Sequence, residues 1–589
     1  MINYPQYIQA ILVLISPLLV SLILVPFILK FARKWKLFDH PDIHNEAMGA
    51  AARKVHTQPT PRLGGLAMVM GFYLSVSLLS RPGDLWKIFL PALAIFLIGL
   101  KDDFKHIPAK TRLLLQITVS ALTVYVANLE LHQLVITPSL VFAIPWWAGF
   151  LLSVFILTGS INAINMVDGL DGLAGGLVLI STTLLGYLFF LETGDPAMFL
   201  MITLPLVGSI LGFLRYNTYP SKIFMGDGGS NWLGFMTGLV MLMVARGSIL
   251  GEKYAAGGES GGVVLIPLIS ILLCMAIPIL DTGFVISARL LKGKNPATPD
   301  KIHFHHGLMK IGLSHPNAVI LIYFISLLIG IAGFFPILFE NYSSWVVPFV
   351  VPVLLLMLLY VVMKLEEKAA EKVPLYQILF TTGKKEEISK FSKLFNAWSK
   401  LNQNILFVIL LAIPVFAGSQ SKEIGLSAGV VFILLVSSHV FQFWKNDFID
   451  ILIVSLGAII LLIANNSHMV QIILSGKTYS IQSLYNFLFI ALSVSTILFL
   501  ILTFKKQYLQ TSPTDFLLLI LPLLLLLTTP SFNQKYNLTI ISLRSFVLFL
   551  SLMTTFKVDQ KLTEKFRTII AFSLLYVFFT GFLGMKIVY

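Results

Sequence analysis

The sequence is poor in charge and almost without cysteine. Of its 589 residues only 12% are charged, whereas 57% are hydrophobic, and a soluble domain averages about 25% charged residues. So few charges cannot cover the exterior of a water-soluble chain of this length, which excludes a cytosolic enzyme, a secreted domain and a nucleic-acid-binding protein. The single cysteine, Cys274, excludes a disulfide framework and a thiolate metal site made within one chain. A polytopic membrane protein fits this composition, because lipid covers its apolar surface.

The hydrophobic runs also lack the alternation of polar and apolar residues that marks membrane β-strands, as the run at 516–529 illustrates. A helix crosses the hydrocarbon layer with about 20 apolar residues, and by that rule we predict an all-α polytopic membrane bundle of about eighteen helices. Their predicted centres lie near residues 19, 72, 94, 120, 151, 182, 206, 239, 275, 328, 355, 411, 435, 457, 493, 522, 549 and 578.

The distribution of the polar residues suggests an orientation and a division of the chain. Lys30, Arg33, Lys34 and Lys36 directly follow the first span, and because basic residues favour the cytoplasmic side, we expect the N-terminus outside. Long loops rich in Asp, Asn and His occur only in the first half. We therefore expect a functional membrane domain over 1–344, a last span with a cytoplasmic linker over 345–403, and additional membrane helices of unknown role over 404–589.

Polar clusters in the first half are candidates for a functional site, because ionisable groups at membrane depth are costly. All of them fall on the side that the basic residues mark as cytoplasmic. The candidate residues are Lys54, Arg62, Asp102, Asp103, Lys110, Asn162, Asn165, Asp168, Asp171, Asp227, His303, His305 and His306.

The types of these residues indicate phosphate chemistry. Adjacent helical residues point about 100° apart, so Asp102 and Asp103 are not expected to face the same atom. Asp227 lies among glycines and is a hard oxygen ligand of the kind that Mg²⁺ prefers, and Ser230 is expected to cap the helix that follows. The three histidines lack the spacing of a zinc helix. Acidic and basic groups in a lipid environment favour metal-assisted phosphoryl transfer to a lipid-linked phosphate.

Five motifs in order carry a more specific resemblance, which runs from about residue 50 to 310. With "PTPRLGG", "DDFK", "NAINMVDGLDGLAGG", "FMGDGGS" and "HFHHGL", the chain resembles the polyprenyl-phosphate N-acetylhexosamine-1-phosphate transferase family. The resemblance implies a bacterial inner-membrane enzyme with its active site facing the cytoplasm. Its expected reaction moves GlcNAc-1-phosphate, or a related N-acetylhexosamine-1-phosphate, from a UDP-sugar to undecaprenyl or another polyprenyl phosphate, releasing UMP, as a first membrane step of cell-envelope glycan synthesis.

The resemblance also implies roles for the candidate residues. Asp102, Asp103 and Asp227 would be catalytic, with Asp227 holding Mg²⁺, for which Mn²⁺ could substitute. Substrates would be bound by Lys54, Arg62, Lys110, Asn162, Asn165, Asp168, Asp171, His303, His305 and His306. The implied partners are the UDP-N-acetylhexosamine, the polyprenyl phosphate and membrane lipids, and a homodimer is left open.

Some alternatives remain open at this point. A phospho-MurNAc-pentapeptide transferase belongs to a sister branch, although the pattern H-x-H-H resembles the GlcNAc-type branch more closely. Gly307 replaces an arginine common in that branch, which leaves the identity of the donor open. A transporter would place its ionisable residues near the membrane midplane, often in repeats. Catalysis could proceed in one step, with Asp102 orienting the acceptor, or through an aspartyl intermediate. The resemblance does not explain residues of about 345–589.

Overall fold

The computed structural model describes residues 6–34, 38–39, 59–79, 83–137, 140–193, 197–247, 266–293, 303–310, 313–338 and 346–355, with short pieces and single positions between 357 and 574. The chain folds into two compact units. One comprises residues 9–378 with 512–514, and the other comprises residues 1–8, 379–511 and 515–589. In the latter the described elements include an antiparallel hairpin of β5 (Gln471–Leu474) and β6 (Lys477–Ser480). The predicted domain boundaries at 344 and 403 stay predictions.

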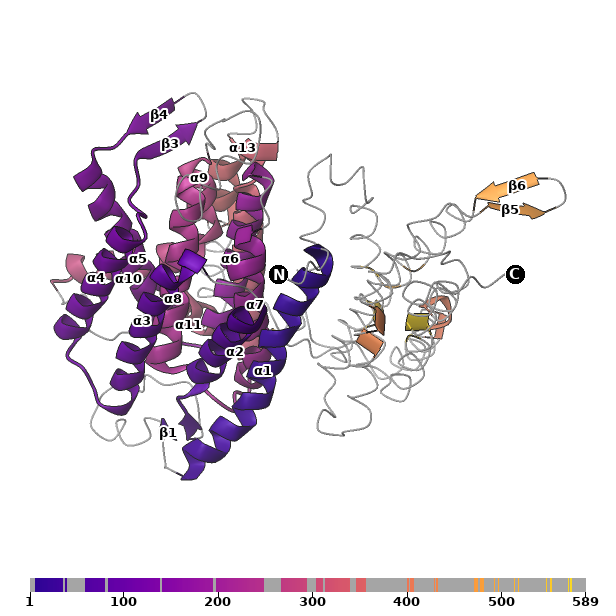
Figure 1. The fold of residues 1–589 in the computed structure, drawn as a ribbon, viewed down its shortest axis with the longest axis horizontal. Coiled ribbons are helices and arrows are strands. Elements are labelled where there is room, and N and C mark those ends of the chain that lie inside the picture. Colours follow the sequence, from indigo (N-terminus) through magenta and orange to yellow (C-terminus); the bar gives the residue numbers. More distant parts are fainter. Residues whose placement is uncertain are drawn as a thin grey trace, which may run out of the picture. The chain divides into compact units, whose positions relative to one another are not determined.

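The unit built on residues 9–378 is a bundle of helices with two small strand pairs (Figure 1). Strand β1 (Phe38–Asp39) pairs with β2 (Thr60–Pro61), and β3 (Gln133–Thr137) pairs with β4 (Leu140–Ala143), both antiparallel. The described helices are α1 (Gln6–Lys34), α2 (Gly64–Leu79), α3 (Trp86–Phe104), α4 (Ala109–Val126), α5 (Trp146–Val167), α6 (Leu173–Thr193), α7 (Leu204–Asn217, after a π-helical turn at Phe199–Thr203), α8 (Gly226–Arg246), α9 (Leu268–Cys274), α10 (Ala276–Leu291), α11 (Phe304–Lys310), α12 (His315–Ala332) and α13 (Phe335–Leu338).

Helices long and apolar enough to cross a membrane are present, as the composition predicts. Six candidate spans lie among the described residues, or seven if a bent pair is counted as one. The predicted centres from 19 to 239, and those at 328 and 355, each fall on residues that are helical in the structure. The centres from 411 onward lie outside the described helices. The chain is thus a multi-pass helical membrane protein, while the total of about eighteen helices and the outward N-terminus stay predictions.

The span predicted near residue 275 is broken in the structure. Helices α9 and α10 meet there at a bend of 82°. Pro278 explains the break, because a proline ring clashes with the carbonyl four residues earlier, here that of Cys274. The span predicted near residue 275 therefore corresponds to this bent pair of helices, and the prediction did not include the bend.

Helix α8 is the centre of this unit and packs most extensively against α3 and α5. Its first turn is approached closely by two other helices. A Cβ atom added at Gly99 of α3 would lie 2.4 Å from the carbonyl oxygen of Asp227, and one added at Gly65 of α2 would lie 2.5 Å from the Cα atom of Gly229. Glycines allow this backbone-to-backbone approach. The start of α8 is consequently fixed by α2 and α3 with little room for adjustment.

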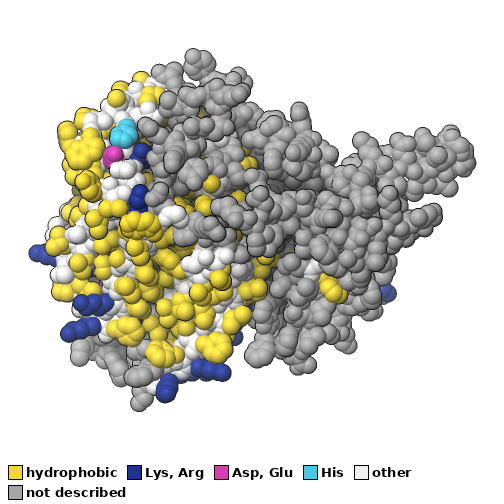
Figure 2. All heavy atoms as spheres, in the orientation of Figure 1, with side chains coloured by type: hydrophobic (Ala, Val, Ile, Leu, Met, Phe, Trp, Pro, Cys, Tyr) yellow, Lys and Arg dark blue, Asp and Glu magenta, His cyan; other side chains and the backbone are white. Residues whose placement is uncertain are grey.

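The two ends of the bundle differ in charge. Helices α3 and α5 end, and α2, α6 and α8 begin, at the end where β1 lies, whereas the β3–β4 hairpin lies at the opposite end (Figure 1). Figure 2 shows a broad apolar surface with Lys and Arg side chains along its lower edge. We call the β1 end the basic end, since its described residues include Lys30, Arg33, Lys34, Arg62, Lys101, Lys105, Lys110, Arg112, Arg215 and Lys222, whereas Lys87 and Arg246 lie toward the hairpin end.

Candidate active site

A short break between α5 and α6 carries two of the predicted carboxylates, Asp168 and Asp171, at the basic end. The glycines of this stretch predict such a break, and the structure confirms it. Gly172 adopts a left-handed φ of +82°, which glycine tolerates without strain. Its N–H donates to Oδ1 of Asn217 at 3.0 Å, and its carbonyl accepts from the hydroxyl of Tyr323. The connection is therefore anchored to both α7 and α12.

Asp168 keeps accessible surface although many protein atoms surround its carboxylate, and we call these surroundings the recess. The loss of bulk water raises the pKa of Asp168 to about 7. Repulsion from Asp227, Asp171 and Asp103 adds to the rise, while the positive charge of Arg62 offsets part of it. Four carboxylates and one guanidinium thus share one electrostatic environment, with negative charge in excess.

Asp227 is held in this environment by Asn165. The Nδ2 group of Asn165, in the last turns of α5, donates to Oδ1 of Asp227 at 2.7 Å and to Oγ of Ser230 at 2.8 Å. Helix α8 already begins at Gly226, so Ser230 lies inside the helix. The expectation that Ser230 caps α8 is therefore wrong, and its hydroxyl instead accepts a hydrogen bond from α5.

The carboxylate that caps α8 comes from another helix. Asp103, near the end of α3, accepts hydrogen bonds from the backbone N–H groups of Asp227 at 2.8 Å and Gly228 at 3.0 Å. These are first-turn donors with no partner inside the helix. Gly226 makes this approach possible, since it has a φ of +74° and a Cβ atom there would lie 2.5 Å from the Arg62 carbonyl and 2.6 Å from Oδ2 of Asp103.

Asp102 faces a different neighbour. Its carboxylate accepts from the N–H of Ile107 at 2.6 Å and from the guanidinium of Arg112 on α4. The residue is 7% exposed. The expected divergence of Asp102 and Asp103 is confirmed: one closes the α3–α4 connection and the other holds α8. The catalytic role expected for Asp102 stays a prediction, although its carboxylate is already engaged away from the cluster around Asp168.

The histidine segment reaches the same recess. A Cβ atom at Gly169 would lie 2.6 Å from Nε2 of His305, so this ring packs directly beside the Asp168 loop. Burial lowers the pKa of His305, and the adjacent His306 adds to the effect. The ring of His303 stacks on that of His305, with centroids 5.5 Å apart.

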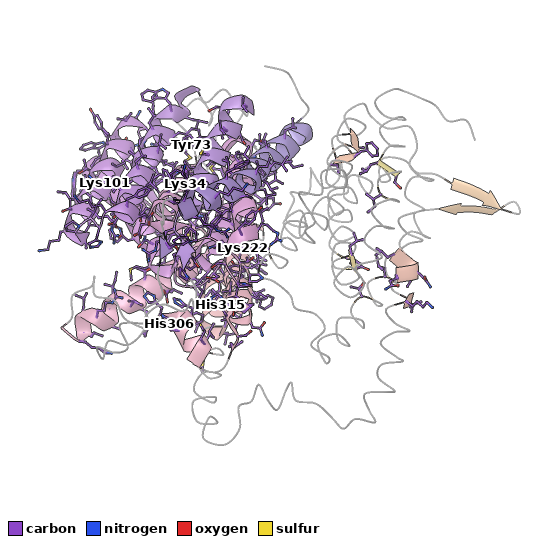
Figure 3. All side chains as sticks on the ribbon, turned by 90° about the horizontal axis from the view of Figure 1, so that it is seen from below. Lys34, Tyr73, Lys101, Lys222, His306 and His315 are labelled. Atoms are coloured by element: carbon purple, nitrogen blue, oxygen red, sulfur yellow. The ribbon has the colours of Figure 1, made fainter. Side chains whose placement is uncertain are left out.

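Two residues that the sequence motifs did not contain contribute to the site. Asp281 of α10 contacts Nδ1 of His303 at 2.8 Å. Nε2 of His315 accepts from the N–H of Asp171 at 3.2 Å, and the His315 ring stacks on Tyr219. Figure 3 views the protein from the basic end and shows His306 and His315 on the same side of the bundle. The sequence signals were an isolated aspartate in an apolar helix and a lone histidine at a helix start.

Other predicted substrate-binding residues lie elsewhere or outside the description. The Nδ2 group of Asn162 donates to Oε1 of Gln116 on α4 at 3.0 Å and to the Thr158 carbonyl at 2.8 Å, so its amide lies in the α4–α5 interface. Lys110 is exposed at the start of α4. Lys54 lies outside the described residues.

The carboxylates suit a cation that is only partly held by protein. Among the described residues no group of three or more His, Cys, Asp or Glu side chains is arranged to hold a metal ion by itself. Mg²⁺ is commonly bound by one or two carboxylates together with substrate phosphates and water. The excess negative charge around Asp168 and the oxygen ligand of Asp227 fit that mode of binding.

Known proteins resemble the chain over this region. Residues 85–245, from the start of α3 to near the end of α8, match the family model described as glycosyl transferase family 4. A Bacillus subtilis (strain 168) protein named probable undecaprenyl-phosphate N-acetylglucosaminyl 1-phosphate transferase is 32% identical over 361 residues, covering 60% of this chain and 90% of that protein.

Two further relatives have similar names. A Mycolicibacterium smegmatis decaprenyl-phosphate N-acetylglucosaminephosphotransferase is 38% identical over 301 residues, covering 48% of this chain and 72% of that protein. An Escherichia coli (strain K12) undecaprenyl-phosphate alpha-N-acetylglucosaminyl 1-phosphate transferase is 29% identical over 359 residues, covering 58% of this chain and 87% of that protein.

Proposed function

The chain belongs to glycosyl transferase family 4, and on that premise we propose that it transfers GlcNAc-1-phosphate from UDP-GlcNAc to a polyprenyl phosphate, releasing UMP. The observation that carries this proposal is the convergence of Asp103, Asp168, Asp171 and Asp227 in one recess beside the histidine segment. The relatives' names all specify N-acetylglucosamine as the transferred sugar. This favours GlcNAc over phospho-MurNAc-pentapeptide, and nothing among the relatives supports a transporter.

Mg²⁺ fits the acidic recess, and Asp227 with Asp168 would hold it. When bound, the ion supplies neutralisation of the diphosphate charge, which is the main requirement of phosphoryl transfer. The chain's own residues do the positioning. Asn165 orients the carboxylate of Asp227, Asp103 fixes the backbone of that residue, and the charge of Arg62 reaches the same recess.

The transfer needs little proton chemistry from the protein. A phosphomonoester has a second pKa near 6, so the acceptor is largely a dianion at neutral pH. Its oxygen attacks the β-phosphorus of the donor, the new P–O bond forms, and the bond to UMP breaks. A one-step route therefore needs no aspartyl nucleophile, and a labelled enzyme intermediate trapped without acceptor would overturn it.

The orientation follows from the charge of the two ends. Lys and Arg side chains gather at the basic end, where the recess also lies, and such residues favour the cytoplasmic side. We infer that the site faces the cytoplasm of a bacterial inner membrane. There the reaction would begin synthesis of a cell-envelope glycan. A homodimer and Mn²⁺ substitution stay predictions.

The test measures UMP release by the purified full-length chain with Mg²⁺, undecaprenyl phosphate and a panel of UDP-N-acetylhexosamines. We expect release with UDP-GlcNAc and its loss on removal of Mg²⁺. Asp227→Asn should reduce turnover by at least about 10²-fold, the usual effect of removing one charge-stabilising group. Glu130→Gln, the same chemical change toward the hairpin end, is the matched control and should leave turnover unchanged. Absence of UMP release with every donor would overturn the proposed function.

A further inference from the structure

Asp281 is a buried carboxylate outside the five sequence motifs. It lies on α10, after the bend with α9, and is 8% exposed. Both of its oxygens are bonded to the histidine segment: Oδ2 contacts Nδ1 of His303 at 2.8 Å, and Oδ1 accepts from the N–H of Phe304 at 2.8 Å. A carboxylate buried in a membrane bundle is costly unless it is fully hydrogen-bonded, and here one segment supplies both partners.

The contact determines which nitrogen of His303 carries a proton. An ionised carboxylate only accepts hydrogen bonds, so Nδ1 of the His303 ring must be the donor to Asp281. The other nitrogen, Nε2, then carries a lone pair and accepts from an N–H or O–H group of a ligand, because the tautomer of a histidine is set by the hydrogen bond of its opposite nitrogen. The same carboxylate also fixes the ring plane.

The second contact fixes the backbone. By accepting from the N–H of Phe304, Asp281 holds the first residue of α11. His305, one residue later, stacks on His303 and packs against Gly169 beside Asp168. The position of the histidine segment relative to the recess therefore depends on a residue of a different helix.

We propose that Asp281 is a positioning residue for the transfer reaction, which holds His303 with its Nε2 atom placed to accept a hydrogen bond from an N–H or O–H group of the sugar donor. This inference rests on the proposed function for the identity of the donor. Asp281 does not itself touch substrate. It acts through His303, and its effect is confined to the donor.

The test compares the kinetics of Asp281→Asn with those of the full-length parent chain. Asparagine can still accept from Phe304, but its NH₂ group faces Nδ1 of His303 and favours the opposite tautomer. We expect kcat/KM for UDP-GlcNAc to fall by about 10–100-fold, the range for groups that orient a functional histidine, while KM for the polyprenyl phosphate is unchanged. Thr282→Val is the matched control on the same helix, because the Thr282 hydroxyl has no hydrogen-bond partner among the described residues.

A double substitution distinguishes a role of Asp281 that acts through His303 from a purely structural role. In a His303→Ala background, Asp281→Asn should add less than about twofold, since coupled residues are not additive. Independent losses that multiply, or equal effects on both substrates, would overturn the proposal.

A measurement that does not need turnover keeps the proposal separate from the proposed function. With ¹⁵N-labelled histidine rings, and the His303 signals identified by their loss in His303→Gln, Asp281→Asn should move the proton from Nδ1 to Nε2. An unchanged His303 spectrum would overturn the inference even if UMP is released. A parent chain that releases no UMP but shows this change would overturn only the proposed function.

Discussion

Replacing Gly99 by alanine tests the close crossing of α3 and α8 on which the site depends. The added Cβ atom would lie 2.4 Å from the carbonyl oxygen of Asp227 and 2.7 Å from the Cα atom of Gly228. Ordinary contact begins near 3.4 Å, so the two helices must separate by about 1 Å. Overpacking of this kind costs about 1–3 kcal/mol of stability. A displacement of about 1 Å at a reacting group lowers activity by about 10²-fold.

The assay measures the thermal midpoint and UMP release per folded molecule in the same detergent. Gly159→Ala on α5 is the control, because a Cβ atom there meets nothing within 4 Å. Alanine in a helix interior is favoured over glycine by about 0.5–1 kcal/mol, so this variant should be slightly more stable. If Gly99→Ala keeps full activity and an unchanged midpoint, α3 does not restrain Asp227 and the reasoning is refuted.

Three further predictions concern other parts of the unit. The pKa of Asp168, about 7 instead of about 4, means that the folded state retains a proton that the unfolded state releases, so stability should fall as pH rises from about 4 to 7. Mg²⁺ should then raise the thermal midpoint more at pH 8 than at pH 6, and a shift independent of pH would contradict the assignment. Arg112→Ala leaves the buried carboxylate of Asp102 without its guanidinium, and should lower the free energy of unfolding by about 1.5–3 kcal/mol. The KM values of the Arg112→Ala variant should not change, and kinetic measurements on the folded fraction would check this. A chain ending at residue 378, where the unit built on residues 9–378 ends, should retain UMP release. A stable but inactive product would show that the remaining residues contribute to the site.

Much of the fold followed from the sequence, because membrane helices are specified locally. Length and hydrophobicity locate them, and the glycines at 169 and 172 mark the break after α5. The divergence of Asp102 and Asp103 also followed, since it depends only on helix geometry. Asn162 shows the limit of such reasoning. It lies three residues before Asn165, and the drift of about 60° per three residues turns its amide toward α4 instead of α8.

The remaining features depend on contacts between distant segments. In the sequence, Asp281 is a single aspartate in an apolar helix, and nothing near it predicts a functional contact. The contact with His303 forms because α10 follows the bend with α9. The position of Ser230 after the glycines predicts that it caps α8, whereas the actual cap, Asp103, lies on another helix. Neither arrangement can be read from spacing along the chain.

The end of α3 connects the lipid-facing helix α4 to the first turn of α8, where Asp227 lies. Asp102 ties it to α4, whose outer face exposes Leu114, Leu122 and Tyr125. Asp103, one residue later, ties it to the backbone of Asp227. A tilt of α4 imposed by a thicker or thinner bilayer must therefore strain one of these two ties. Turnover measured in lipids of different chain length should therefore depend on these contacts of α3 as well as on acceptor binding.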